Sequence, residues 1–319
     1  MDKKMNWMNL RISLRKTFLA LVIGIITTVS MATEVDSFTQ RYSGMRDSLS
    51  ELDRICEEFI LRALEKANSE APGDEEELYD IAYKMFAGGW FWGNFETYIK
   101  ETDRLDKRTI DRKDSIYSDL SFRQSFPMFL ASLGAIYDIG GVIVGSDKFG
   151  HYFEEGYKYY VETFVEGKGV ESALAIGEGE ENGFFGMATT GIYSYGDLYA
   201  NFQGMRFWKD FAPNPFNSQS LVGPYVIMGG DGKWKLNANH KFSWKDYIDP
   251  GWDEGINCNK YFDASYLEKI NKHLELFEAR DNRNYHCPVV PEKCLEIDKI
   301  KDYPQLINRL VSQDCIRRG

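Results

Sequence analysis

The spacing of hydrophobic residues predicts a mainly α-helical chain. From residue 37 to residue 68, apolar side chains recur at intervals of three and four, the spacing of one face of an α-helix. The pattern ends at Ala71-Pro72-Gly73, a helix-terminating sequence, and resumes over residues 75–98. Similar patterns predict further helices over residues 126–144, 146–160, 169–176, 195–211 and 263–279. The first of these is apolar and rich in small residues, so we interpret it as a buried helix.

The character of the chain changes beyond Pro213. In PYVIMGGDGKWKL, residues 224–236, two short strand-like runs flank a glycine-rich turn, which predicts a β-hairpin. Most of the cysteines follow this hairpin. The sequence therefore predicts a helical domain over 37–212 and a second region, 213–319, that contains the hairpin and a disulfide-bearing C-terminal part.

The amino terminus has the pattern of an export signal. Basic residues precede an apolar run from Phe18 to Val29, and Ser30 and Ala32 place small side chains at positions −3 and −1 of a cleavage point. The run is shorter than the ~20 residues of a membrane-spanning helix. We expect residues 1–32 to be a cleaved signal peptide and the mature protein to be extracytoplasmic, periplasmic or secreted, without a membrane span. An uncleaved anchor is the alternative.

Cysteine usage agrees with export. In an oxidising compartment, the four cysteines of the C-terminal region predict two disulfides, with three connectivities left open. Cys56 lies in an apolar helical pattern and is predicted to be buried. A zinc site that uses His286, Cys287 and Cys294 is less favoured, because the paired C-x2-C spacing is absent. The four cysteines are Cys258, Cys287, Cys294 and Cys315.

Composition narrows the classes of function. The chain is 43% hydrophobic and 15% aromatic, which argues against disorder. Its net charge of −11, without a visible basic patch, argues against nucleic acid as a partner. The aromatic cluster GGWFWGNF, residues 88–95, could contact a sugar or a membrane surface, but a role in the core is the favoured interpretation because aromatic side chains bury large areas.

Residues 146–160, SDKFGHYFEEGYKYY, carry the first candidate for chemistry. Residues four apart lie on one face of a helix, so the helical pattern predicts a single polar stripe there. Lys148 lies about 100° away round the helix and is predicted to pair elsewhere or to extend along the surface. The predicted stripe contains Asp147, His151, Glu154 and Lys158.

A second polar stripe lies in YGDLYANFQGMRFW, residues 195–208. Asp197 and Asn201 are set among apolar neighbours, which indicates burial, and buried polar groups need partners. Gly204 on the same face would let another backbone approach closely. We expect the two stripes to pack together, so that Asp147, His151, Asp197 and Asn201 share hydrogen bonds.

These segments resemble the VanZ-like family of membrane proteins, which carries an Asp-Lys-x-x-His segment, a glutamate and an Asp-Leu-x-Ala-Asn-x-x-Gly segment in this order. Here the matching residues are DKFGH at 147–151 and DLYANFQG at 197–204, with Glu178, Glu180 and Glu181 as candidates for the glutamate. The resemblance covers residues 147–204 and implies a shared polar cluster and a link to the cell envelope. It implies no particular reaction, and the surrounding segments are more polar than the transmembrane helices of that family.

A histidine held by a carboxylate is the usual arrangement for a general base or an oriented metal ligand. Oxygen-rich surroundings would favour a divalent cation such as Mg²⁺, Ca²⁺ or Mn²⁺ as a cofactor. Arg206 is a candidate anion contact and equally a surface residue. The other histidines lack acidic partners at helical spacing and are interpreted as ordinary polar residues: His240, His273 and His286.

Three hypotheses follow from this constellation. The protein is an enzyme that acts on an envelope lipid or glycan, a binding protein that uses the same pocket, or a protein in which a buried polar network fixes helix packing. The candidate catalytic residues are His151, Asp147, Asp197 and Asn201.

Overall fold

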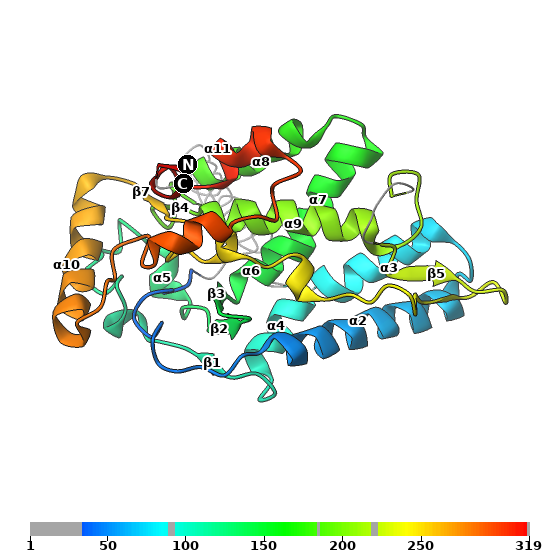
Figure 1. Cartoon of the computed structure of the whole chain (residues 1–319), viewed down its shortest axis with the longest axis horizontal. Helices are drawn as coiled ribbons and strands as arrows, with labels where there is room; N and C mark the ends of the chain where they lie inside the picture. Colours follow the sequence, from blue (N-terminus) through cyan, green and yellow to red (C-terminus); the bar gives the residue numbers. More distant parts are fainter. Residues whose placement is uncertain (1–33, 89–92, 184–185, 218–222, 318–319) are drawn as a thin grey trace, which may run out of the picture.

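The structure, a computed structural model, describes residues 34–88, 93–183, 186–217 and 223–317. It is mainly α-helical, as predicted. Helix α9 (Tyr195–Phe211) runs through the middle of the molecule and is buried along nearly its whole length, as expected for a helix with apolar residues on all sides (Figure 1). The predicted signal peptide, residues 1–32, lies outside the described residues, as do residues 89–92 of the aromatic cluster.

The first two predicted helices differ from expectation at their ends. Helix α2 (Leu49–Glu70) starts later than predicted, because residues 37–48 form turns. There the Asp36 carboxylate accepts hydrogen bonds from the backbone of Phe38 and Thr39, which competes with helix formation. The predicted helix over 75–98 is two helices, α3 (Glu75–Ala87) and α4 (Asn94–Glu101).

The prediction of a buried helix over residues 126–144 is wrong. Helix α5 (Pro127–Leu130) is a single turn, and an antiparallel hairpin of β2 (Ile136–Ile139) and β3 (Val142–Gly145) follows it. Gly140 and Gly141 both have positive φ, the conformation that a tight hairpin turn requires. The β-branched residues after this turn favour a strand. Strand β1 (Lys107–Arg108) completes a three-stranded sheet.

The segment predicted as one regular helix contains two wide turns. Helix α6 (Asp147–Gly150) continues into a π-helical turn, η2 (His151–Glu155), then α7 (Gly156–Tyr160) and a second π-helical turn, η3 (Val161–Val165). Each wide turn rotates the residues beyond it relative to an ideal helix. The single polar stripe is therefore not formed: Asp147 is buried, and Lys158 is exposed beside Glu155.

Two glycines bring this helix against α9. A Cβ atom on Gly204 would lie 1.8 Å from the carbonyl oxygen of Tyr152, and one on Gly156 would lie 2.6 Å from the Cα of Gly204. The predicted close backbone approach at Gly204 is confirmed. It fixes the distance between the two helices that carry the candidate site.

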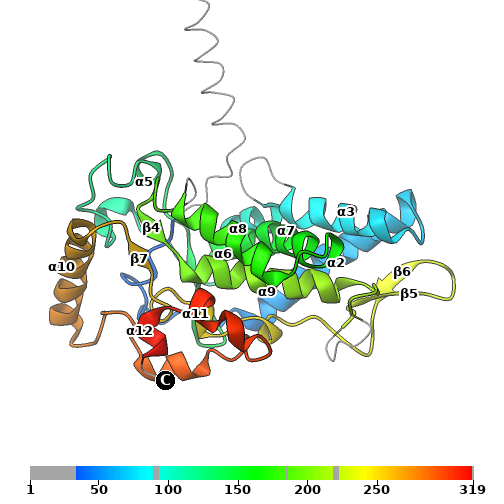
Figure 2. The same cartoon turned by 90° about the horizontal axis from the view of Figure 1, so that it is seen from above.

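The C-terminal third packs onto the same hydrophobic core, which extends from Phe38 to Cys315. The predicted hairpin is present as β5 (Val226–Met228) and β6 (Trp234–Leu236), and it lies at the opposite end of the molecule from α10 (Ala264–Asp281) (Figures 1 and 2). The remaining elements are α8 (Val170–Asn182), the paired strands β4 (Ile192–Tyr193) and β7 (Lys260–Tyr261), η1 (Arg112–Asp114), η4 (Trp244–Asp246), η5 (Pro250–Trp252), η6 (Pro291–Glu296), η7 (Pro304–Leu306), α11 (Ile307–Leu310) and α12 (Gln313–Ile316). None of the helices in the described part of the chain has the length and hydropathy needed to cross a bilayer.

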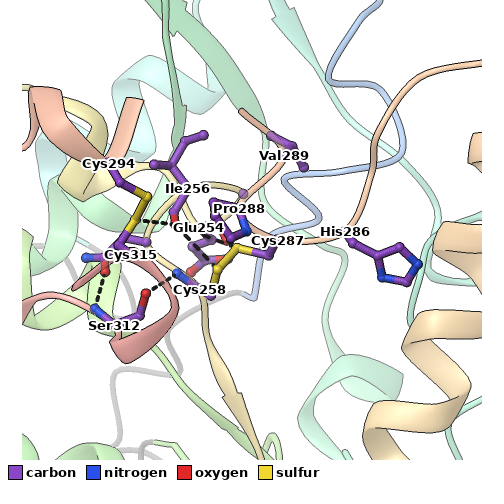
Figure 3. Close-up of a disulfide and its surroundings, with 12 residues drawn as sticks. Glu254, Ile256, Cys258, His286, Cys287, Pro288, Val289, Cys294, Ser312 and Cys315 are labelled. Carbon is purple, nitrogen blue, oxygen red and sulfur yellow. Dashed lines mark hydrogen bonds between the residues drawn. A yellow bond between two sulfur atoms is a disulfide. The ribbon is translucent and has the colours of Figure 1, made fainter. Parts of the chain in front are cut away.

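The two predicted disulfides are present, and their connectivity is Cys258–Cys287 and Cys294–Cys315. Cys56 is a buried free thiol, as predicted. The alternative zinc site is wrong, because both of its cysteine sulfurs are in disulfides and the ring of His286 is turned away from them (Figure 3). The disulfides fit an oxidising compartment.

Candidate functional site

The centre of the site is Lys148, a residue that the sequence pattern predicted to pair elsewhere or to extend along the surface. Its side chain is 1% exposed, and its Nζ lies 2.8 Å from Asp147, 2.5 Å from Asp197 and 2.6 Å from Glu254. These carboxylates come from α6, from α9 and from the loop after η5. Lys148 neither extends along the surface nor pairs away from the predicted site, because three carboxylates pair with its ammonium and offset the cost of burying that charge.

The local backbone explains how Lys148 reaches this position. It is the second residue of α6, and its backbone N–H donates to the Asp147 carboxylate at 2.9 Å. Its methylene stem then passes Gly196 of α9, where a Cβ atom would lie only 3.0 Å from the lysine Cε. Ser194, the N-cap of α9, accepts from the Asp197 backbone and donates to Glu254 at 2.9 Å. The start of α9 thus holds two of the three carboxylates.

His151 connects to this cluster through Asp197. Its Nε2 lies 3.3 Å from the second carboxylate oxygen of Asp197, and its Nδ1 lies 3.1 Å from the side-chain amide of Asn201. When the amide is oriented so that its NH₂ group faces Nδ1, it also reaches the carbonyl oxygens of His151 and Asp197 at 3.3 and 3.1 Å. That orientation suits a neutral ring, whereas the opposite one suits an imidazolium that donates to the amide oxygen.

The structure brings three of the four predicted site residues into direct contact: His151, Asp197 and Asn201. Asp147 joins them through Lys148 rather than through the histidine. The side chain of His151 is 12% exposed, so the imidazole lies at the edge of the buried network. Asp197 links the two parts, with one oxygen on Lys148 and the other on His151.

The charged groups of the cluster shift one another's pKa values. Burial alone would lower the pKa of His151, but the Asp197 and Asp147 carboxylates outweigh burial and raise it. Burial would raise the pKa of Asp197, but His151 and Lys148 outweigh burial and hold it below its ordinary value. For Asp147 and Glu254, burial outweighs the attraction of Lys148, and their pKa values are raised. The ionised partner of the histidine is therefore Asp197.

Of the glutamates that the sequence left open, Glu181 joins the cluster. It is buried and accepts a hydrogen bond from the backbone of Ser194 at 2.9 Å, and burial raises its pKa well above the ordinary value. Glu178 instead forms a 2.8 Å ion pair with Arg309. Glu180 is half-buried, and burial together with Glu155 raises its pKa.

Glu96 is a further acidic group beside His151 that sequence reasoning missed. It is 4% exposed in α4, and a Cβ atom on Gly150 would lie 2.5 Å from its Oε2. Burial raises its pKa to about 8, with Asp147 contributing and Lys100 opposing. Glu96 is thus protonated near neutral pH. The sequence could have indicated that Glu96 is buried, because it lies three residues before Ile99 and so on the buried face of its helix.

A divalent cation does not fit the cluster as it stands. Asp147, Asp197 and Glu254 each offer one oxygen, and these oxygens lie within 4.8 Å of one another. The ammonium of Lys148 already binds all three carboxylates and supplies the positive charge that a metal would bring. We therefore derive no step through a metal.

Two residues remain: Arg206, which was a candidate anion contact, and Glu254, which the sequence analysis did not identify. Arg206 donates to the side chain of Gln203 and to the carbonyl oxygen of Lys299 at 3.3 Å. Glu254 was missed because it follows a proline–glycine break in a loop, where no helical spacing applies. Its position between Trp252 and Ile256, two apolar residues that are buried, could have indicated that Glu254 is buried too.

No known family model matches this chain, and neither a curated protein nor a solved structure matches it. The VanZ-like resemblance of residues 147–204 stays a prediction.

Proposed function

We propose that this is an extracytoplasmic cell-envelope protein that binds or acts on an envelope glycan, with His151 as its proton-transferring group. The observation that carries the proposal is the division of Asp197 between Lys148 and His151. A buried ion network thereby ends on a partly exposed imidazole, which is the arrangement that orients a general acid or base.

The electrostatics indicate the direction of proton transfer. The Asp197 and Asp147 carboxylates outweigh burial and raise the pKa of His151, so they stabilise a proton on its ring, and this ring would act as a general acid toward a substrate oxygen. Asp197 stabilises the imidazolium, and Lys148 holds Asp197 in place. Asp197, Asp147 and Glu155 interact with this histidine, which disfavours an anionic lipid headgroup and favours a neutral, hydroxyl-rich glycan.

The compartment rests on three independent features. The disulfides are typical of an oxidising environment. The amino-terminal pattern predicts export. The resemblance of residues 147–204 to VanZ-like proteins links the polar cluster to the cell envelope.

One observation favours a structural role for the same network. Both ring nitrogens of His151 have a partner within the protein, so the histidine is satisfied without a ligand. In an enzyme or a binding protein, the ligand would have to replace Asn201 at Nδ1 or act after its amide rotates. A purely structural histidine would never exchange that partner.

A nuclear magnetic resonance titration of protein labelled with ¹³C at its histidine rings distinguishes a functional role of His151 from a structural one. Soluble fragments of envelope glycans are added, and a His151→Gln variant assigns the His151 signal. We expect at least one fragment to shift that signal saturably while the other three histidines, His240, His273 and His286, serve as internal controls. If no fragment moves it and His151→Gln lowers the melting temperature by many degrees, the network is structural.

A further inference from the structure

A cavity of about 580 Å³ lies at the end of α10, lined by residues of three distant segments. Residues 39–43 form one wall, Arg108 of β1 a second, and residues 280–285 a third. Three of the lining residues are arginines and one is an aspartate, in a chain whose net charge is −11. The cavity thus gathers three guanidinium groups on an acidic protein.

The three arginines differ in how far they are neutralised. Arg280 forms two 2.7 Å hydrogen bonds with Asp281, and Arg108 forms a 2.5 Å ion pair with Asp106. Arg283 lies over the ring of Tyr42 at 4.8 Å, and within the described part of the chain no ion pair with a carboxylate is found for it. Its guanidinium keeps its hydrogen-bond donors available for a ligand.

The walls of the cavity are held in place. Arg41 forms a buried ion pair with Asp253, the residue before Glu254, and so fixes the segment that carries Tyr42. Tyr42 packs edge-on against Tyr285 at 5.3 Å, and the Tyr285 hydroxyl donates to Asp281 at 2.6 Å. Fixed walls reduce the entropy lost on binding a ligand.

We propose that this cavity binds a phosphate or sulfate monoester, such as a phosphorylated or sulfated sugar. The tetrahedral oxyanion can accept hydrogen bonds in fork geometry from Arg283, whose donors no carboxylate of the described residues occupies, while Arg280 and Arg108 add positive charge nearby. Hydroxyl groups of Ser43 and Tyr42 line the same space and suit the sugar part. The inference concerns a different surface from His151 and stands whether or not the proposed function holds.

The test is calorimetric titration of the full mature chain at low salt with glucose 6-phosphate, inorganic phosphate and inorganic sulfate, and sedimentation with phosphatidylglycerol vesicles. We expect glucose 6-phosphate to bind and Arg283→Gln to weaken binding about tenfold, the loss of one charge-assisted contact. Arg62→Gln, which removes an exposed arginine of α2, is the matched control and should leave binding unchanged. Raising the salt concentration should weaken binding in wild-type protein.

Vesicle binding that is lost in Arg283→Gln, without sugar-phosphate binding, would support the site and assign its phosphate to a lipid headgroup. Absence of binding to all four probes would overturn the proposal. Equal binding by wild type and Arg283→Gln would overturn it as well, because the ligand would then be held elsewhere.

Discussion

Replacing Lys148 by methionine removes one ammonium and keeps most of the side-chain volume. Three carboxylates within 2.8 Å of the ammonium lose their shared cation, and among the described residues only Asp197 keeps a direct ion pair with another group, His151. Removing one partner of a buried ion pair costs about 3–5 kcal/mol. We expect a loss near the upper end of this range, about 5 kcal/mol in the free energy of unfolding at pH 8, because two buried carboxylates remain uncompensated.

The loss should depend on pH in a defined direction. Lys148 lowers the pKa values of Asp147 and Glu254 in the wild type, so removing it raises them further above their unfolded values. The folded variant then binds more protons than the unfolded chain, and stability falls as pH rises through the folded pKa values. The deficit of Lys148→Met should therefore shrink to about 1–2 kcal/mol at pH 5.

Urea denaturation followed by tryptophan fluorescence at pH 5 and pH 8 measures both quantities, since Trp208, Trp244 and Trp252 are fully buried. Lys66→Met, an exposed position on α2, is the matched control and should change little. The second substitution Glu254→Gln should recover part of the loss at pH 8. A deficit below about 1 kcal/mol, or one that is equal at both pH values, would show that Lys148 does not hold the three carboxylates together.

Three other predictions test parts of the account. Burial raises the pKa of Glu96 to about 8, so the wild type loses stability as the buried carboxyl ionises at high pH. Glu96→Gln should therefore have the same unfolding free energy as the wild type at pH 5 and exceed it by up to about 4 kcal/mol at pH 9. A difference in unfolding free energy that stays constant with pH would contradict a protonated Glu96. Gly204→Ala should lower the unfolding free energy by about 2–3 kcal/mol, because a Cβ atom at this position meets the backbone of Tyr152. Gly230→Ala is the control and should be nearly neutral, because a Cβ atom there has nothing within 4 Å. Equal denaturation midpoints for the two variants would disprove the tight helix contact. Peptide mapping without reduction should recover the two cross-linked pairs, and alkylation should reach Cys56 only after unfolding; labelling of Cys56 in the native protein would contradict its burial.

The helices that periodicity predicted well are those with uninterrupted spacing. Residues 195–211 form α9 with the predicted limits, and 263–279 correspond closely to α10. The pattern failed over 126–144, because short apolar runs with glycine are compatible with either a buried helix or a hairpin. It also failed to reveal the wide turns at His151 and Val161, which alter the direction of side chains without altering the apolar spacing.

The sequence predicted only part of the candidate site. His151, Asp197 and Asn201 could be paired because polar residues among apolar neighbours must be satisfied by one another. Lys148 could not be placed, since its position depends on the room above Gly196 and on Glu254, which is 106 residues away in a loop. Long-range ion pairs of this kind leave no periodic signal in a single sequence.

Asp197 joins the buried Lys148 cluster to a partly exposed histidine. The most direct measurement is the pKa of His151, obtained from the pH dependence of its ¹³C-labelled ring signal in the wild type and in Asp197→Asn. We expect a wild-type pKa above the ordinary histidine value, because the carboxylates outweigh burial, and a pKa below that value in Asp197→Asn, where burial and Lys148 dominate. An ordinary pKa that the substitution leaves unchanged would contradict the claim.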